Sequence, residues 1–370
     1  MQKRSFGRTG LETTLLGFGG FHLLEIPVSE AEYLLNTYLD AGGNYIETAA
    51  SYGKGASERK IGLSVAHRRS DYVLVTKTGE RSRQGCLDSI DQSLERLKTD
   101  HVDVLLMHGV GTRDDLQTIL GPDGALEGAA KAVAAGKVGF VGLSMHGQPD
   151  VLIEALESYD FSAVMSTINY YDRFNFPKIE EVLLPLANRQ NTAVILMKPV
   201  ADGLLWRSAA AAFRYAFSQP VSVVVAGINN REMLADDLAF AESFVPMSES
   251  EKETLFKDAI ELGTYVCRQC GLCMPCPEGI DIPEIFKLEG WFDRQMADGI
   301  VTNAAEYALK ERLRFWFNNR DKAMDQYREL PVKADACTNC GLCSPRCPYG
   351  IDIVRKLGIA DYKLAAKQIF

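Results

Sequence analysis

The chain has 370 residues, more than one hydrophobic core usually holds, so its length favours a large domain and a smaller one. With 46% hydrophobic and 24% charged residues, the composition is that of a globular protein and excludes collagen-like and intrinsically disordered classes. A net charge of −9 argues against nucleic acid or anionic lipid as the main partner.

The sequence shows no targeting or membrane segment, because no apolar run approaches the roughly 20 residues that a membrane helix needs. The first ten residues, MQKRSFGRTG, contain no apolar stretch typical of a secretory signal, so we expect a cytoplasmic protein. Eight of the nine cysteines lie from Cys267 onward. In a reducing compartment they indicate metal ligands and not disulfides, whereas Cys86 falls in an expected helix.

Residues 1–245 alternate short apolar runs with helical patterns. Runs such as YVLVTK and VSVVVAG lack polar alternation, as expected for parallel strands covered on both faces. Helical stretches separate them; SEAEYLLNTYLDAGG is expected to begin at a capping box of Ser29 and Glu32 and to end at Gly42. The eight expected strands cover residues 14–19, 44–48, 72–78, 102–108, 138–145, 162–168, 192–198 and 221–228.

Eight strand–helix units over about 250 residues predict an α/β fold, the (β/α)8 TIM barrel. A doubly wound open sheet is the alternative. It normally carries a glycine-rich fingerprint after its first strand, and GFGGF matches that fingerprint poorly.

Chemistry in such a barrel lies at the carboxyl ends of the strands. Glu47 and Tyr52 follow the second expected strand, Lys77 ends the third and His108 ends the fourth. A free tyrosine is a poor acid at neutral pH, but an adjacent ammonium stabilises tyrosinate and a carboxylate keeps that ammonium charged. This set therefore predicts protonation of a carbonyl oxygen.

Four stretches resemble signature segments of the aldo/keto reductases: GGNYIETAASYGKGASERKIG, YVLVTKTG, SLERLKTDHVDVLLMHG and AAGKVGFVGLSMHG. The resemblance implies that Tyr52 is the general acid, Lys77 its electrostatic partner, Glu47 the carboxylate behind Lys77, and His108 the residue that orients the carbonyl. It also implies NADPH extended across the barrel mouth, with hydride passing to the carbonyl carbon. The cofactor contacts expected from it are Gly19, Gly20, Ser144, Asn169, Lys198, Gly227, Asn229 and Arg231.

The sequence departs from that family's pattern at several positions. Glu47 stands where Asp is usual, which adds one methylene to the side chain. Met145, Met165 and Met197 stand where Asn, Gln and an aromatic residue are common, and Asp237 where Asn often meets the adenine. A flavin therefore stays an alternative hydride carrier. The MKP run at 197–199 is similar to the iron–sulfur-bearing branch of the family.

The rest of the chain contains a duplicated cysteine motif, CRQCGLCMPCPEGIDI at 267–282 and CTNCGLCSPRCPYGIDI at 337–353. Three thiolates spaced two residues apart can hold one cube of iron and sulfide, while the fourth, followed by proline, ligates the other cube. Zinc is the alternative, but zinc sites use two pairs separated by a longer loop. The motif predicts two [4Fe–4S] clusters with crossed ligands, one on Cys267, Cys270, Cys273 and Cys347, the other on Cys337, Cys340, Cys343 and Cys276.

The segments IPEIFKLEGWFDRQMADG and NAAEYALKERLRFWFNN between the two motifs read as helical, with Pro283 in the first turn of a helix that Asp281 opens. This part of the chain therefore resembles an α-helical dicluster ferredoxin domain, in which the basic run at 310–314 is expected to solvate a helix face. We expect a barrel over 1–245, a connecting segment over 246–262 and a small, mainly helical ferredoxin-like domain over 263–370.

Three functional hypotheses follow, because a hydride carries two electrons whereas a cluster passes one at a time. In the first, the barrel acts on a small carbonyl or alcohol while the clusters exchange electrons with an external one-electron carrier, which requires a flavin or a substrate that tolerates one-electron steps. In the second, the protein is a plain NADPH-dependent reductase with structural or oxygen-sensing clusters. In the third, it is a non-catalytic electron-transfer module, which the intact set of Glu47, Tyr52, Lys77 and His108 argues against.

Overall fold

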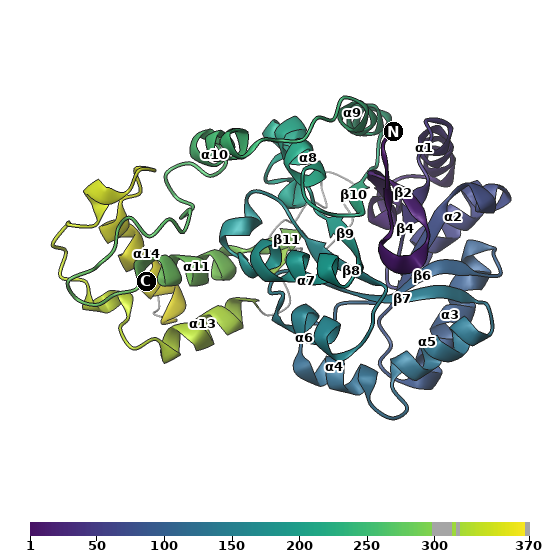
Figure 1. Ribbon diagram of the computed structural model, residues 1–370, viewed down its shortest axis with the longest axis horizontal. Coiled ribbons are helices and arrows are strands. Elements are labelled where there is room, and N and C mark those ends of the chain that lie inside the picture. Colours follow the sequence, from purple (N-terminus) through teal and green to yellow (C-terminus); the bar gives the residue numbers. More distant parts are fainter. Residues whose placement is uncertain (298–312, 316–318, 367–370) are drawn as a thin grey trace.

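The computed structural model describes residues 1–297, 313–315 and 319–366. Its larger lobe is a closed barrel of eight parallel strands in the order β10-β3-β4-β5-β6-β7-β8-β9 (Figure 1). The predicted (β/α)8 fold is confirmed, and the open-sheet alternative is wrong. The strands are β3 (Leu16–Gly19), β4 (Tyr45–Glu47), β5 (Val73–Thr78), β6 (Val102–Met107), β7 (Val138–Met145), β8 (Ala163–Thr167), β9 (Ala193–Met197) and β10 (Val223–Gly227).

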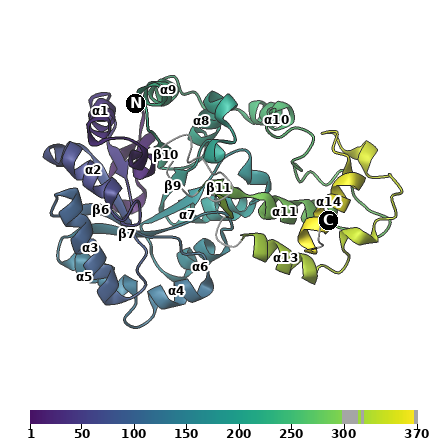
Figure 2. The same ribbon diagram turned by 180° about the vertical axis from the view of Figure 1, so that it is seen from behind.

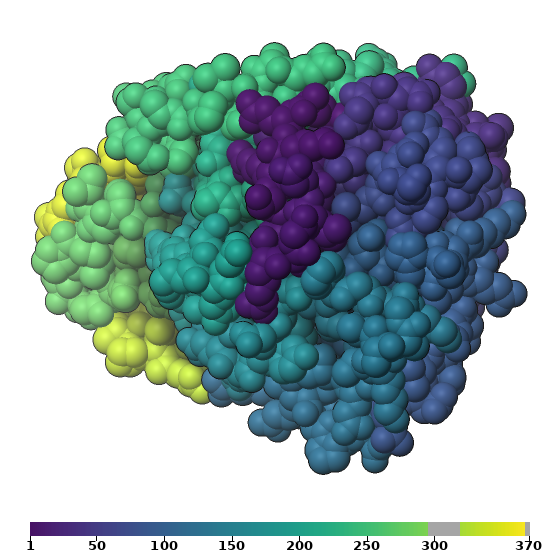
Figure 3. Space-filling view, turned by 45° about the vertical axis from the view of Figure 1, so that its right-hand side comes forward, coloured from purple at the N-terminus to yellow at the C-terminus, as the bar shows by residue number. Residues whose placement is uncertain are grey.

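Each of the eight expected runs contains one of these strands, because a run buried on both faces must be continuously apolar. Phe6 belongs to the apolar cluster inside the barrel, and its ring lies 6.0 Å from the ring of Tyr45. Phe6 follows β1 (Lys3–Ser5), which pairs antiparallel with β2 (Glu12–Thr14). The space-filling view shows this amino-terminal segment as a purple band across one face of the barrel lobe (Figure 3).

Helices surround the barrel, and Cys86 is buried in one of them, as expected. In the described part of the chain, no helix is long and apolar enough to cross a membrane. The helices of this lobe are α1 (Val28–Asp40), α2 (Ala56–Val65), α3 (Arg83–Leu97), α4 (Arg113–Leu120), α5 (Ala125–Ala134), α6 (Asp150–Ser158), α7 (Leu184–Arg189), α8 (Ala209–Phe217) and α9 (Arg231–Glu242).

The capping box expected at Ser29 and Glu32 is wrong. Helix α1 begins one residue earlier, after Pro27, and no side chain caps it. Pro27 leads the chain into the helix with φ −68° and ψ 162°, so Ser29 already lies within the first turn. The other end follows expectation, because Gly42 has φ +84° just beyond the helix.

The cysteine-rich lobe is mainly helical, with α11 (Ile282–Asp293), α13 (Asn319–Glu329) and α14 (Ile353–Leu364). As predicted, Asp281 caps α11 and a proline stands in its first turn. The helical prediction fails at β11 (Gln295–Ala297) and β12 (Leu313–Phe315), which pair antiparallel, because a distant partner strand satisfies their backbone. The rest of the second predicted helix, residues 303–312 and 316–318 with 310–312 of the basic run, lies outside the described residues.

The two lobes lie side by side, with α11 and α13 facing the barrel (Figures 1 and 2). Trp291 of α11 stacks on Phe176 with ring centroids 6.1 Å apart and an interplanar angle of 4°, and its indole nitrogen donates to the carbonyl of Asn175. Helix α10 (Glu249–Asp258) occupies the expected connecting segment, and a capping box of Ser248 and Glu251 starts it. The lobes therefore share a packed aromatic contact.

Candidate active site and metal centres

Three predicted catalytic residues meet at the carboxyl ends of β4 and β5. The ammonium nitrogen of Lys77 donates to the Tyr52 hydroxyl at 3.0 Å and to the Thr48 carbonyl at 2.9 Å. The same nitrogen forms an ion pair with the Glu47 carboxylate, and both side chains are buried. Glu47 therefore reaches Lys77 directly from the neighbouring strand despite its extra methylene.

His108 stands next to this group, just after β6. Its ring lies edge-on to Tyr52, with centroids 5.8 Å apart and an interplanar angle of 81°. Its Nδ1 is 3.2 Å from the Ser51 hydroxyl, which sets the orientation of the ring. The Phe21 ring also packs edge-on with the phenol of Tyr52, with 5.1 Å between centroids. The structure thus brings all four predicted residues together.

The electrostatics of the group follow from its burial. Burial raises the pKa of Tyr52 and lowers the pKa of Lys77, since each charged form loses its water. The Glu47 carboxylate opposes the second effect because its negative charge favours the ammonium form. A phenol held against a paired ammonium can give a proton to an oxygen and remain stabilised as tyrosinate.

Three glycines expected to contact a cofactor lie where neighbouring backbone and side chains crowd them. A Cβ on Gly19 would lie 2.8 Å from the Ala226 carbonyl oxygen, and one on Gly227 would lie 2.3 Å from the His22 ring. A Cβ on Gly20 would meet a backbone oxygen at 2.8 Å. These positions are glycine because β3, β10 and the segment after β3 pack closely at the barrel mouth.

Asn229 and Arg231 lie beside the start of α9. The Asn229 amide donates to Glu25 at 2.6 Å, and the Arg231 guanidinium binds both oxygens of Glu30 at 2.9 Å while lying 3.7 Å over the ring of Tyr33. Arg231 is the first residue of the helix and its side chain is 59% exposed. An exposed ion pair is weak, and a helix start favours anions, so these residues fit a nucleotide phosphate.

Asn169 and Lys198 are engaged within the protein. The Asn169 amide group donates to Asp172 at 2.8 Å and to the Lys198 carbonyl at 3.1 Å, and its oxygen accepts the backbone N–H groups of Tyr171 and Asp172. The Lys198 ammonium forms an ion pair with Asp202. Both residues therefore hold the loops after β8 and β9 in place.

Sequence reasoning missed Arg294, which joins this network from the cysteine-rich lobe. Its guanidinium bonds to Asp172 at 2.7 and 3.0 Å and to Asp202 at 2.9 Å. No local signal could have found it, since both partners are about ninety or more positions away in the chain.

The residues that depart from the family pattern at the barrel mouth are packed. Met165 and Met197 belong to the apolar cluster inside the barrel, and Met145 is buried outside it. Methionine fills irregular gaps readily, which accounts for these positions. The Ser144 hydroxyl lies 3.4 Å from a backbone N–H and from a backbone carbonyl at the end of β6.

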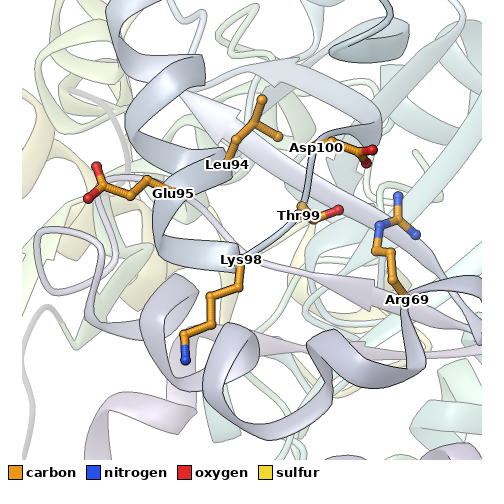
Figure 4. Close-up of a pocket in the computed structure, with 6 residues that line it drawn as sticks. All are labelled: Arg69, Leu94, Glu95, Lys98, Thr99 and Asp100. Carbon is orange, nitrogen blue, oxygen red and sulfur yellow. The ribbon is translucent and has the colours of Figure 1, made fainter.

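A shallow hollow lies at the opposite end of the barrel, at the amino ends of β5 and β6 (Figure 4). It is lined by Arg69, Leu94, Glu95, Lys98, Thr99 and Asp100. Barrel chemistry takes place at the carboxyl ends of strands, so this hollow takes no part in the site.

The two cysteine motifs repeat one backbone conformation. Gly271 and Gly341 have φ +72° and +74°, the left-handed region that a tight turn around a cluster requires. Asp281 and Asp352 each cap a following helix by accepting a backbone N–H. The internal repeat in the sequence is therefore also a repeat of structure.

The fold brings the fourth cysteine of each motif to the other motif. Cys276 lines one small pocket together with Cys337, Cys340 and Cys343. Burial raises the pKa of Cys267, and the nearby thiols of Cys270 and Cys347 raise it further. A cube of iron and sulfide binds one thiolate at each of four corners, so these positions of Cys276 and Cys347 are the ones that two clusters with crossed ligands would require.

Asp237, where the family often has Asn, is buried in α9. Desolvation, with the charge of Asp236 second, raises the pKa of Asp237 to about 8 from its ordinary 3.8. The folded state then holds a proton more tightly than the unfolded state, so stability falls as the pH rises from about 4 to about 8.

Asp237→Asn should therefore stabilise the protein, with a larger gain at pH 8 than at pH 5. We expect at least about 1.4 kcal/mol at pH 8, the free energy of one pH unit of protonation. Denaturant unfolding at both pH values measures this gain, with Glu242→Gln, an exposed position on the same helix, as the control. A gain of equal size at the two pH values would contradict the assignment.

Anaerobically prepared protein should contain about eight iron and eight acid-labile sulfide per chain. The double variant Cys276→Ala/Cys340→Ala should keep about four iron, because crossed ligands place both losses in one cluster. The matched variant Cys276→Ala/Cys270→Ala should lose iron from both clusters. If instead Cys276→Ala/Cys270→Ala keeps about four iron and Cys276→Ala/Cys340→Ala loses iron from both clusters, each cluster takes its ligands from a single motif.

Comparisons with known proteins agree with both parts of the structure. The sequence model of the aldo/keto reductase family matches residues 15–208, and that of the 4Fe-4S dicluster domain matches residues 263–351. An uncharacterized oxidoreductase of Bacillus subtilis is 28% identical over 217 residues, and L-galactose dehydrogenase of Arabidopsis thaliana is 30% identical over 221 residues. Each match covers 55% of this chain and 67% of the relative.

Solved structures match the barrel. The holo form of an aldo-keto reductase from Bacillus halodurans aligns with a TM-score of 0.59 and 25% identity, covering 68% of this chain and 94% of that one. A thermostable aldo-keto reductase solved with the inhibitor epalrestat aligns with a TM-score of 0.56 and 25% identity, covering 69% of this chain and 99% of that one.

Proposed function

Because this chain belongs to the aldo/keto reductase family, we propose that its barrel interconverts a small carbonyl compound and the corresponding alcohol, with Tyr52 as general acid and base. The observation that carries the proposal is the 3.0 Å contact from the Lys77 ammonium to the Tyr52 hydroxyl, with Glu47 paired behind it. His108, beside the phenol, orients the substrate oxygen.

In the reducing direction, Tyr52 gives its proton to the carbonyl oxygen as hydride adds to the carbonyl carbon, which yields the alcohol. The phenol then carries a negative charge, which the Lys77 ammonium at 3.0 Å stabilises. Glu47 keeps Lys77 charged and aimed, so the pair is arranged before substrate arrives. In the oxidising direction the tyrosinate accepts the alcohol proton.

We propose NADP(H) as the hydride carrier; when bound, it supplies the hydride that this chain's own residues cannot. Arg231 and Asn229 at the start of α9 would hold its phosphate end, and the close-packed Gly19, Gly20 and Gly227 would let it approach the barrel mouth. Ser144, Asn169 and Lys198 would form the part of the site that binds the nicotinamide. Asn169 and Lys198 would do so by holding the loops after β8 and β9 in place. A flavin stays the alternative carrier.

We further propose that the two clusters exchange single electrons with an external carrier. The support is that Cys270 and Cys340, one from each motif, are exposed, which brings both clusters close to the surface. A second candidate is a plain NADPH-dependent reductase in which the clusters are structural. The stacking of Trp291 on Phe176 favours that candidate, because it makes the cluster domain a brace for the barrel.

Tyr52→Phe should lower carbonyl reduction by about 10²- to 10⁴-fold, because only the transition state needs the phenolic proton. Nucleotide affinity and iron content should stay within error of the unaltered protein. Steady-state kinetics and nucleotide titration measure both, with the exposed Tyr159→Phe as control. Unaltered turnover in Tyr52→Phe would mean that another group supplies the proton.

Cys340→Ala separates the two candidates for the clusters. If the clusters exchange electrons, the variant should lose turnover driven by a reduced viologen dye and keep turnover driven by NADPH. If they are structural, dye-driven turnover should be absent from the start, and the variant should lower the melting temperature and NADPH-driven activity together. A two-cluster protein that never accepts or donates single electrons would overturn electron exchange.

A further inference from the structure

The end of helix α11 carries a charged side chain out of the cysteine-rich domain and into the barrel. Arg294 directly follows the helix and is 3% exposed. Its Nε and Nη2 donate to the two carboxylate oxygens of Asp172 at 2.7 and 3.0 Å, and Nη2 also donates to Asp202 at 2.9 Å. Asp172 follows β8 and Asp202 follows β9, so one guanidinium joins two consecutive loops at the barrel mouth.

The network continues to residues on the proposed nucleotide side of the barrel. The Asp172 carboxylate accepts the amide of Asn169 at 2.8 Å, and Asp202 pairs with the ammonium of Lys198. Lys198 and Asp202 have φ +60° and +55°, a left-handed conformation that is costly for residues other than glycine. Such a backbone persists when its surroundings hold it, and here the surroundings are the ion pairs.

Among the residues that the structure describes, two cations of this network meet two carboxylates. Arg294 and Lys198 face the carboxylates of Asp172 and Asp202. Burial alone would lower the pKa of Arg294, but the two carboxylates raise it above its ordinary value, so the guanidinium stays charged. Without it, the buried carboxylate of Asp172 would lose this ion pair and could regain water only if the loop after β8 opened. The Asp202 side chain is 17% exposed and would keep its pair with Lys198, but the bridge between the two loops would be lost.

Helix α11 connects this network to a cluster motif. The helix begins at Ile282, six residues after Cys276, and is fixed on the barrel by Trp291, which stacks on Phe176. Arg294 and Cys267 also line one pocket between the two lobes. The cation at the barrel mouth is therefore placed by the domain that carries the cysteines.

We propose that Arg294 is a positioning residue of the nucleotide site, supplied to the barrel by the cysteine-rich domain. It holds the loops that carry Asn169 and Lys198 and does not touch the reacting atoms. Only the two-pronged guanidinium can bridge both carboxylates; an ammonium is a single point charge. The inference rests on the proposed function in one respect, that the nucleotide binds against these loops.

The first test measures hydrogen exchange in the two loops and does not depend on enzymatic activity. By hydrogen–deuterium exchange, Arg294→Met should speed exchange roughly tenfold or more in residues 169–176 and 198–205, since the buried Asp172 carboxylate loses this ion pair and the bridge to Asp202 is broken. Segment 45–52, which carries Glu47 and Tyr52, should be unchanged. The control is Arg328→Met in the same domain, where the exposed guanidinium pairs within α13 with Asp325.

The second test measures the affinity for the nucleotide. Arg294→Met should raise the Kd and KM for NADPH about tenfold while kcat at saturating NADPH changes less than about threefold, because only binding common to ground and transition states is lost. Arg294→Lys should restore part of the affinity, and iron content should be equal in all variants.

The inference is overturned if exchange in both loops is unchanged in Arg294→Met, whatever the catalytic result. It is also overturned if exchange, kcat, iron content and melting temperature all worsen together and equally in the Met and Lys variants, since that describes general loss of packing. If exchange rises in the two loops but the unaltered protein binds no NADPH, the proposed nucleotide fails and the positioning role of Arg294 stands.

Discussion

A buried ammonium on β5, paired with a carboxylate on β4, is the contact on which the barrel mouth depends. Lys77 and Glu47 are almost fully buried, and breaking such a pair by removing one partner costs about 3–5 kcal/mol because an uncompensated charge remains. The closed barrel makes the contact possible, since neighbouring parallel strands bring their carboxyl ends to one rim. Tyr52 and His108 are then placed around the ammonium by the turns that follow β4 and β6.

A second buried set of charges ties the two lobes together by the same physics. Arg294 crosses from the cysteine-rich lobe to Asp172 and Asp202, and Trp291 adds an aromatic contact one turn earlier on α11. Both contacts fall on loops after β8 and β9, on the other side of the barrel mouth from Lys77. The barrel mouth is thus built from two lobes, and its two halves are held by separate ion pairs.

In the cysteine-rich lobe, the last cysteine of each repeat lies near the other repeat. Each repeat has a glycine turn, a proline after its last cysteine and an aspartate that caps the next helix. Cys276 lies against the second repeat and Cys347 near the first, so with crossed ligands neither donor set would be complete until both repeats have folded together. Binding of iron and sulfide would therefore stabilise the whole lobe and not one motif, as metal binding does in other small domains.

Much of this structure could be predicted from local pattern. Continuous apolar runs predicted all eight barrel strands, because burial on both faces leaves a signal in each run by itself. The strand ends then predicted which residues share the rim, and the cysteine spacing predicted a dicluster domain. The helix starts were less secure: Ser29 and Glu32 have the residue types of a capping box, yet Pro27 determines where α1 begins.

What only the tertiary structure decided are the contacts between residues far apart in the chain. The pairing of β11 with β12 replaced a predicted helix, since hydrogen bonds to a distant strand outweigh a weak local preference. The conformation of Lys198 and the roles of Asn169 and Asp172 depend on Arg294, about 92 to 122 positions away from its partners. Such ion pairs leave no periodicity or spacing in the sequence, because charge and distance in space, not separation along the chain, set their energy.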